Sequence, residues 1–348
     1  MDPRTLRIAF TLLVALLAAL AAQALRMPLP WMLGPLFATA ALGIAGAPLA
    51  ASNRLRNVGQ FVIGVALGLY FTPSVVGLIV RLAPAIVLGV AWALLLGHLF
   101  FRFLHATNGG DAASAYFAAA IGGASEMAVL AERHGGQVDR VAAAHSLRVL
   151  LVVSIVPFGL QWSGLHALDA TPTALAELHP AGLALLLAAG AAGVVALRRT
   201  GLPNPFVLGA LLVTLVLTAA GVQLSGLPRW VSPMAQLFIG VSLGARFTPA
   251  FVHAAPRWLG AVAAGTLAMI GVSAAGAWAL AGGVGLHPAT LLLATAPGGI
   301  AEMAITAKVL QLGVPVVTAF QVVRYVAVLT LTAPLFRRTQ RRAAVPAR

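Results

Sequence analysis

The 348-residue sequence contains no cysteine and very few charged side chains. The absence of cysteine excludes disulfides, thiolate metal sites and cysteine nucleophiles. Only 9% of the residues are charged, and eight are acidic, whereas a soluble globular protein carries about a quarter charged residues. This composition excludes an ordinary soluble domain.

Apolar runs fill the sequence instead, because 60% of the residues are hydrophobic. Runs of about 20 residues, long enough for membrane helices, recur throughout: 8–25, 83–101, 181–197 and 259–280. They do not alternate as the strands of a β-barrel do. We therefore predict an all-α polytopic membrane protein.

The first apolar run allows two interpretations. It follows Arg4 and Arg7 and ends in Ala22-Gln23-Ala24, as a cleavable signal peptide would. A similar run at 181–197 also ends in Ala-Leu-Arg and lies too far along the chain to be a signal. This similarity favours a first transmembrane helix that is retained.

Two halves of the chain repeat each other. "AIGGASEMAV" (120–129) returns as "APGGIAEMAI" (296–305), and "QFVIGVALGLYFTP" (60–73) returns as "QLFIGVSLGARFTP" (236–249). The sequence therefore predicts two transmembrane repeats, 1–172 and 173–348, the second with a short basic tail. Six apolar segments can be drawn in each: 6–25, 31–50, 57–71, 77–104, 113–131 and 141–163, then 179–197, 204–221, 231–247, 257–282, 289–307 and 313–335.

The positive residues indicate how the repeats are oriented, because cytoplasmic loops are enriched in arginine and lysine. With twelve crossings, the positives outside the segments divide almost evenly between the two sides. If the glutamate-containing segment of each half re-enters on the same side, sixteen lie inside and four outside. A rival arrangement, in which the short third segment does not span, gives fourteen and six. Both predict inverted repeats of about five transmembrane helices, and the first places both termini in the cytoplasm.

Inverted repeats with interrupted helices are typical of secondary transporters, whose substrate site lies at the midplane. An ionised carboxylate at the bilayer centre costs about 2.5–3.5 kcal/mol, so Glu126 and Glu302 need a reason to be there. Glycine tolerates unusual backbone angles and proline removes a helix hydrogen bond. The expected helix breaks are Gly122, Gly123, Pro297, Gly298 and Gly299.

Arg148 and Arg324 follow the two glutamates by 22 residues and are their expected counter-charges. Three residues before each arginine lies a polar residue, His145 or Gln321. One interpretation is a structural ion pair in each half; the other, which the duplication favours, is a lining for a substrate or ion site. His145 could carry a coupling proton, because histidine titrates near neutral pH, or could simply be hydrogen-bonded.

Other repeated residues are weaker candidates. Gln60 and Gln236 are polar residues among apolar neighbours and are included as binding candidates. Glycines spaced four apart permit close helix packing, which is the favoured interpretation for Gly64, Gly68, Gly240 and Gly244.

The chain resembles the AbrB-like family of bacterial integral membrane proteins, built from a duplicated AbrB domain. The motifs that carry the resemblance are "WMLGPL", "VLGALL", "GGASEM…HSLRVLLVVSIVP" and "PGGIAEM…FQVVRYVAVLTLTAP". Members are often labelled ammonia monooxygenases or AbrB family transcriptional regulators. The repeat plan is also similar to the folds of bile acid/sodium symporters and proton antiporters, whose broken helices carry Pro-Gly-Gly turns.

The resemblance and the residues together suggest a multi-pass protein of the bacterial inner membrane that transports a small solute by alternating access, coupled to Na⁺ or H⁺. The alternative is a membrane protein that acts indirectly on gene expression. We expect no enzyme, because the dispersed histidines do not suit copper and no nucleophile constellation is present. No cofactor or metal is expected. Expected partners are the bilayer, a small solute and, as an open option, a second copy of the chain; nucleic acid is not expected.

Overall fold

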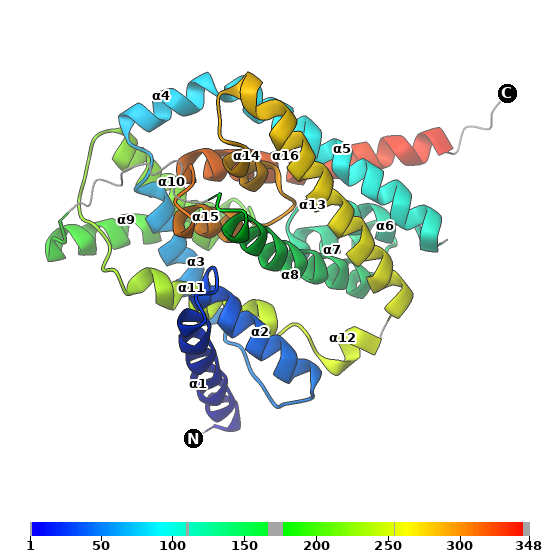
Figure 1. Ribbon diagram of the computed structural model, residues 1–348, viewed down its shortest axis with the longest axis horizontal. Coiled ribbons are helices and arrows are strands. Elements are labelled where there is room, and N and C mark those ends of the chain that lie inside the picture. Colours follow the sequence, from blue (N-terminus) through cyan, green and yellow to red (C-terminus); the bar gives the residue numbers. More distant parts are fainter. Residues whose placement is uncertain (1, 109–110, 166–176, 254, 344–348) are drawn as a thin grey trace. The chain divides into compact units, whose positions relative to one another are not determined.

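The computed structural model describes residues 2–108, 111–165, 177–253 and 255–343, which form helices and loops without a strand. Figure 1 shows the order of the helices along the chain. In the first half they are α1 (Pro3–Ala24), α2 (Pro30–Ile44), α3 (Asn53–Gly68), α4 (Pro73–Arg81), α5 (Ala83–Asn108), α6 (Ala112–Ala119), α7 (Ala124–Arg133) and α8 (Val138–Trp162). In the second half they are α9 (Pro180–Arg199), α10 (Pro205–Ala219), α11 (Val231–Gly244), α12 (Pro249–His253), α13 (Pro256–Val284), α14 (Pro288–Thr295), α15 (Ile300–Val309) and α16 (Val314–Ala343).

Helix lengths support the membrane class. Six helices, α1, α5, α8, α9, α13 and α16, are long and apolar enough to cross a membrane. The pair α3 and α4 could form a seventh span, but the two helices meet at an angle of 88°. The all-α polytopic class predicted from composition is thus confirmed.

The apolar segments with the glutamates are each divided into two short helices. α6 ends at Ala119 and α7 begins at Ala124; α14 ends at Thr295 and α15 begins at Ile300. The fourth segment of the first half, expected at 77–104, is divided between α4 and α5, whereas that of the second half, expected at 257–282, is the single helix α13, with the short α12 before it. Proline at the start of α4, α12 and α13 fits these boundaries, since proline is tolerated in the first helical turn.

The described residues cluster into two compact units, and each unit takes helices from both halves. Unit 1 comprises Met1–Arg81, Pro157–His253 and Ala304–Val316; unit 2 comprises Leu82–Val156, Ala254–Met303 and Val317–Arg348. The division by contacts therefore does not follow the boundary between the sequence repeats, which stays a prediction about duplication.

In unit 1, helices of one half pack on helices of the other. α3 packs on α10, and α11 packs on α2. A Cβ at Gly64 would strike the Val207 carbonyl, and one at Gly240 would strike the Met32 carbonyl. Glycine at these positions lets the helix backbones approach closely, which confirms the packing interpretation.

The first helix of each half is held in the same way. α1 packs on α2, and α9 packs on α10. Gly34 of α2 lies against the backbone of Ala18, and Gly209 of α10 lies against that of Gly193. α1 thus packs on α2 as α9 packs on α10, which agrees with the duplication.

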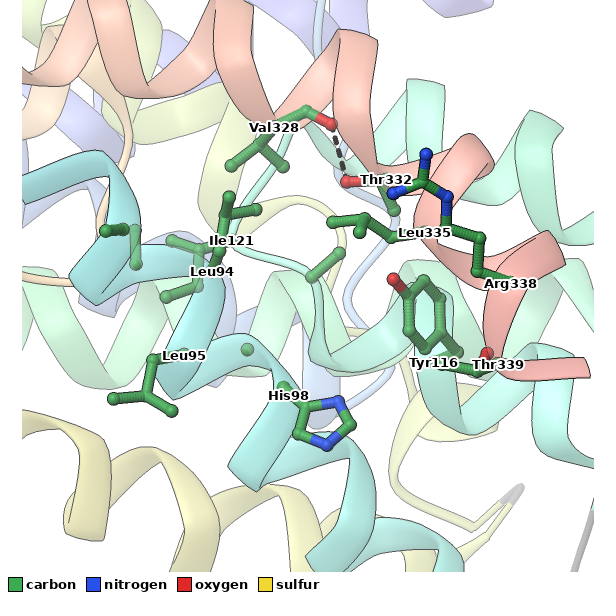
Figure 2. A pocket seen from close by; sticks show the side chains of 14 residues that line it. Leu94, Leu95, His98, Tyr116, Ile121, Val328, Thr332, Leu335, Arg338 and Thr339 are labelled. Carbon is green, nitrogen blue, oxygen red and sulfur yellow. Dashed lines mark hydrogen bonds between the residues drawn. The ribbon is translucent and has the colours of Figure 1, made fainter. Parts of the chain in front are cut away.

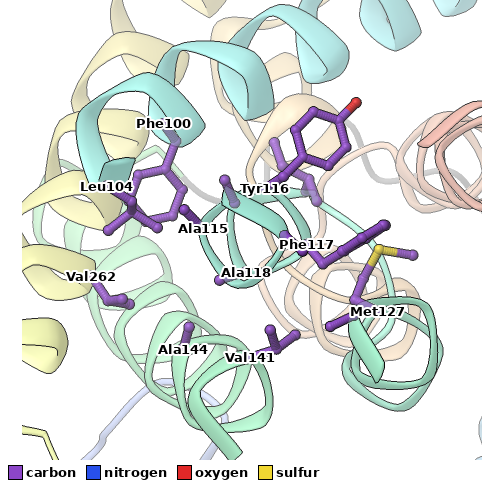
Figure 3. Packing of buried hydrophobic residues seen from close by; sticks show 14 of the residues in the cluster. Phe100, Leu104, Ala115, Tyr116, Phe117, Ala118, Met127, Val141, Ala144 and Val262 are labelled. Carbon is purple, nitrogen blue, oxygen red and sulfur yellow. The ribbon is translucent and has the colours of Figure 1, made fainter. Parts of the chain in front are cut away.

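Unit 2 has an apolar core built around α6 (Figure 3). Seven of the eight α6 residues, Ala113–Ala119, are buried. They contact side chains of α5, α7, α8 and α13, among them Leu104, Met127, Val141 and Val262. A short helix with apolar residues on all faces is stable only when it is buried on all sides. The packing of this core therefore holds α6, and with it the start of the first interruption, in place.

Candidate functional site

Six of the eight polar residues singled out from the sequence belong to unit 2. These six are Glu126, Glu302, His145, Arg148, Gln321 and Arg324. The five residues expected to interrupt the helices, Gly122, Gly123, Pro297, Gly298 and Gly299, belong to unit 2 as well. Gln60 and Gln236 belong to unit 1. The glutamate and arginine motifs thus form one candidate site in unit 2.

Arg148 of α8 reaches the first interruption, between α6 and α7. Its Nη1 donates to the carbonyl oxygens of Ala118 at 3.2 Å and Ala120 at 3.0 Å, and its Nη2 donates to that of Gly122 at 3.4 Å. The last carbonyls of a helix have no intrahelical donor. A planar guanidinium, with its five N–H groups, can serve several of them at once.

Arg324 of α16 serves the second interruption in the same manner. Its Nη1 donates to the carbonyl oxygen of Ala296 at 2.6 Å, and its Nη2 donates to that of Gly298 at 2.5 Å. The amide Nε2 of Gln321 donates to the carbonyl of Leu293 at 2.8 Å, one turn earlier in α14. The C-terminal end of α14 is thus covered by one face of α16.

The contacts at the two interruptions correspond residue by residue. Adding 176 to Ala120, Gly122 and Arg148 gives Ala296, Gly298 and Arg324, which make the equivalent hydrogen bonds. His145 Nε2 lies 2.9 Å from the carbonyl oxygen of Phe117, and Gln321 makes the matching contact in the other half. The duplication therefore extends to individual hydrogen bonds.

The glutamates lie back over the second glycine of each interruption. A Cβ at Gly123 would overlap a carboxylate oxygen of Glu126, and a Cβ at Gly299 would overlap one of Glu302. Gly123 has φ −73° and ψ 141°, angles that any residue can adopt. Glycine is therefore needed here for space beside the carboxylate, and not for the unusual backbone angles that we expected.

Arg148 is not placed as the sequence suggested. In the described part of the chain Glu126 and Arg148 form no ion pair, and the Arg148 guanidinium contacts carbonyls and His145 instead. Arg324 likewise donates to the carbonyls of the interruption. The arginines thus hold the broken helices, and each glutamate lies on the first turn of the following helix, where the helix dipole favours a negative charge.

His145 is held between two partners in the interior. Its Nδ1 lies 2.8 Å from Nη2 of Arg148, and its Nε2 lies 2.9 Å from the Phe117 carbonyl oxygen. A guanidinium can only donate and a carbonyl can only accept. These contacts suit the neutral ring with its proton on Nε2, an assignment from the hydrogen-bond network, and they favour the hydrogen-bonding interpretation of His145 over proton coupling.

The two arginines are deeply buried, with exposed fractions of 2% for Arg148 and 4% for Arg324. Three buried polar atoms of the arginines and of Gln321 have no hydrogen-bond partner among the described residues: Nε of Arg148, Nε of Arg324 and Oε1 of Gln321. Buried polar groups normally have partners, so a water molecule or solute is expected beside these atoms.

A cavity of ≈ 870 Å³ reaches the first interruption at Ala120 and Ile121. Figure 2 shows aliphatic side chains such as Leu94 at one end, and Tyr116 and Arg338 at the other. The cavity lies between α5, α6 and α16. Its size lies within the usual range of small-molecule sites.

Two contacts near the interruptions could not be read from the motifs. The ring of Tyr325, on α16, would lie 3.3 Å from a Cβ at Gly123. A tyrosine after an arginine gives no signal by itself. Met127 and Met303, expected to be packing residues, do pack: each fills the space beside the first glycine, Gly122 or Gly298.

Histidines and acidic residues are dispersed in the described part of the chain. Within residues 2–108, 111–165, 177–253 and 255–343, no three histidine, aspartate or glutamate residues come together to hold an ion. The arrangement instead offers two carboxylates, two guanidiniums and backbone carbonyls around two breaks in the helices.

Comparison with known proteins identifies the family of the chain. A family model described as "Transition state regulatory protein AbrB" matches residues 31–340. The chain is 27% identical to YhjN of Bacillus subtilis (strain 168) over 339 residues, covering 88% of this chain and 86% of that protein. It is 26% identical to the "Putative regulator AbrB" of Escherichia coli (strain K12) over 334 residues, covering 93% and 94%. No solved structure matches the chain. Because the family model spans most of its length, the chain belongs to the AbrB family of membrane proteins.

Proposed function

We propose that this protein is a secondary transporter of a small solute, works by alternating access and is coupled to an ion. The observation that carries the proposal is the pair of matched helix interruptions in unit 2, each covered by a buried arginine and followed by a glutamate. Discontinuous helices that surround a central site are a recurrent plan among secondary transporters.

The cost of this arrangement supports a functional role. Backbone carbonyls without intrahelical donors are tolerated at membrane depth only where they are buried in protein or line a cavity. Placing Arg148 and Arg324 in the interior adds the cost of burying two charges. A continuous helix at residues 112–133 would need neither, so stability alone does not account for the interruptions.

Buried donors without a hydrogen-bond partner and a nearby cavity support the binding of a solute. Nε of Arg148 and Nε of Arg324 are donors without a protein acceptor in the described chain. The cavity of ≈ 870 Å³ borders the first interruption. In the proposed mechanism, the solute and water occupy this region, and Glu126 and Glu302 bind the coupling Na⁺ or H⁺.

The proposal includes inverted repeats with both termini in the cytoplasm, because the distribution of arginines favours that topology. The chain has no cysteine, so single introduced cysteines can be labelled without background. Gln137, exposed in the loop before α8, should then be cytoplasmic. Labelling of Gln137→Cys by an impermeant reagent added outside intact cells would contradict this topology.

Glutamate-to-glutamine variants test transport most directly. Glu126→Gln and Glu302→Gln keep the size of the side chain and remove its charge. In proteoliposomes supplied with a solute panel and with Na⁺ or H⁺ gradients, we expect wild-type uptake and no uptake by either variant. Thermal stability should stay near that of the wild type; if both variants fail to fold, the glutamates are structural and the proposed role is wrong.

The names of relatives support a second candidate, a membrane protein that acts indirectly on gene expression. The family description contains the word "regulatory", and the name of the Escherichia coli relative contains the word "regulator". One experiment separates the transporter from the regulator. The gene is deleted, the Glu126→Gln variant is reintroduced, and transcripts are measured. A regulator whose effect does not need the solute site restores normal transcripts with this variant, whereas a transporter whose solute causes the effect does not.

A further inference from the structure

Unit 1 contains a second pocket, whose lining shares none of the glutamates and arginines of the proposed transport site. It has a volume of ≈ 410 Å³ and lies between the ends of α3 and α10, the start of α11 and the C-terminal half of α15. The polar residues that line it are Tyr70, Thr72, Thr218, Gln223, Ser225, Arg229, Ser232, Gln236 and Lys308.

Two cations line this pocket. Lys308 is the only lysine of the chain, and its Nζ donates to the hydroxyl of Ser232 at 3.1 Å. Arg229 is the second cation. Neither makes an ion pair in the described part of the chain, and no acidic residue lines the pocket. Glu177 comes near through its backbone, which binds Gly226, but its carboxylate is exposed and lies 3.9 Å from His179.

Gln236 adds a buried donor to the same pocket. Its side chain is 6% exposed, and it lines the pocket beside Ser232 and Lys308. Gln236, a binding candidate from the sequence, thus lines this pocket in unit 1, while the glutamate motifs lie in unit 2.

We propose that this pocket binds a small organic carboxylate, with Lys308 and Arg229 as its charge partners and Gln236 and Ser232 as further donors. Charge-assisted hydrogen bonds of this kind are the strong ones. Leu69, Leu227 and Val309 add apolar lining, which suits the carbon skeleton of an organic anion better than an inorganic ion.

Two further observations agree with an anionic ligand. Burial lowers the pKa of the Lys308 ammonium below its usual 10.5, and a bound carboxylate would stabilise the charged form. The first half does not repeat the cations: Glu132, Arg56 and Asn53 stand where the second half has Lys308, Ser232 and Arg229. The two cations of this pocket are therefore not part of the duplicated pattern.

The single lysine allows a direct test on the purified full-length protein. An amine-selective reagent can modify only Lys308 and the α-amino terminus, so mass spectrometry follows both, with the terminus as an internal control. We expect succinate or glutarate to slow the modification of Lys308 alone, and neutral succinamide to have no effect. The proposal is wrong if neither dicarboxylate protects Lys308, or if only inorganic phosphate does.

Variants test whether the cations hold the ligand. Because a hydrogen bond to a charged group contributes about 1.5–3 kcal/mol, succinate should bind Lys308→Gln and Arg229→Gln at least roughly tenfold more weakly than wild type by calorimetry. Arg257→Gln, which removes an exposed cation at the start of α13, is the matched control and should bind as wild type does. Lys308→Arg keeps the charge and should bind more tightly than Lys308→Gln, which guards against a folding defect. Equal affinity of wild type and Lys308→Gln would overturn the assignment.

The readout is binding, so the inference does not depend on transport. Loss of uptake in the Glu126 and Glu302 variants bears on the proposed function alone, and protection of Lys308 bears on this pocket alone.

Discussion

The two helix interruptions of unit 2 use different side chains to cover equivalent carbonyl groups. In the first, Arg148 is joined by His145, and its hydrogen bonds to the link residues measure 3.0 and 3.4 Å. In the second, Arg324 is joined by Gln321, and the equivalent hydrogen bonds measure 2.6 and 2.5 Å.

The starts of the divided segments show the same pattern. Asp111 caps α6 by accepting from the backbone N–H groups of Ala113 and Ser114, whereas His287 caps α14 by accepting from that of Ala289. Different side chains thus fill equivalent hydrogen-bonding roles. The two halves therefore share two features. In each, side chains form hydrogen bonds with the backbone groups around a helix break, and a glutamate lies on the next helix.

Removing the arginines should have the largest effect on this comparison. Arg148→Met and Arg324→Met leave carbonyls of the interruptions without donors, and each such buried group costs about 1–3 kcal/mol. We expect a strong loss of stability in both, and the larger loss for Arg148→Met, because Arg148 serves three carbonyls, whereas Arg324 serves two, one of which also accepts from Gln321. Thermal melting in detergent measures this. An Arg324→Met protein as stable as wild type would show that the carbonyls find other partners.

Glycine-to-alanine variants should show whether the second glycine of each interruption is needed for the space beside the glutamate or for its backbone conformation. Gly123→Ala and Gly299→Ala place a Cβ on the carboxylate of Glu126 or Glu302, so the glutamate must leave its position. We expect proteoliposome uptake to be lost while the melting temperature falls only slightly, since an off-rotamer side chain costs about 0.5–1.5 kcal/mol.

Gly122→Ala is the matched control for the glycine variants. Its Cβ would meet the flexible end of Met127, 3.0 Å away, so uptake should be largely kept. If Gly122→Ala and Gly123→Ala lose uptake equally, Gly123 does not act by leaving space for the Glu126 carboxylate.

Exchanging the polar residue before the arginine should have a smaller effect. His145→Gln copies the second half, and its amide can still donate to the carbonyl of Phe117, as Gln321 does to that of Leu293. We expect a stability loss below about 1.5 kcal/mol, the value of one ordinary hydrogen bond, and an unchanged pH profile of uptake between about pH 5 and 8. A flattened pH profile would instead restore the proton-coupling role of His145.

Replacing the proline of the second interruption should have the smallest effect. Pro297→Ile copies Ile121, and residues 120–123 show that the break forms without proline. Proline restricts the unfolded chain, so its loss should cost only about 0.4–1 kcal/mol. Uptake should be kept. An uninterrupted or inactive second segment would show that the two breaks are maintained by different means.

Several features followed from the sequence because they depend on local chemistry. Long apolar runs can form only helices in a membrane, since backbone groups there must bond within the segment. Gly122-Gly123 and Pro297-Gly298-Gly299 marked where the helices end, because these residues disfavour a continuous helix. The repeat of Glu126 as Glu302 predicted a shared site, which stays a prediction, although both glutamates belong to unit 2.

Tertiary structure decided which groups meet. Spacing placed Arg148 one helix after Glu126, but it could not show whether the guanidinium would meet the carboxylate or the open carbonyls of α6. The carbonyls need donors wherever they are buried, and the structure gives them the arginine. Likewise, the sequence showed one lysine, Lys308, but only the packing of α15 beside the start of α11 set it against Ser232 in a pocket. Such contacts join residues far apart in the chain, so they depend on how the helices pack and not on any local pattern.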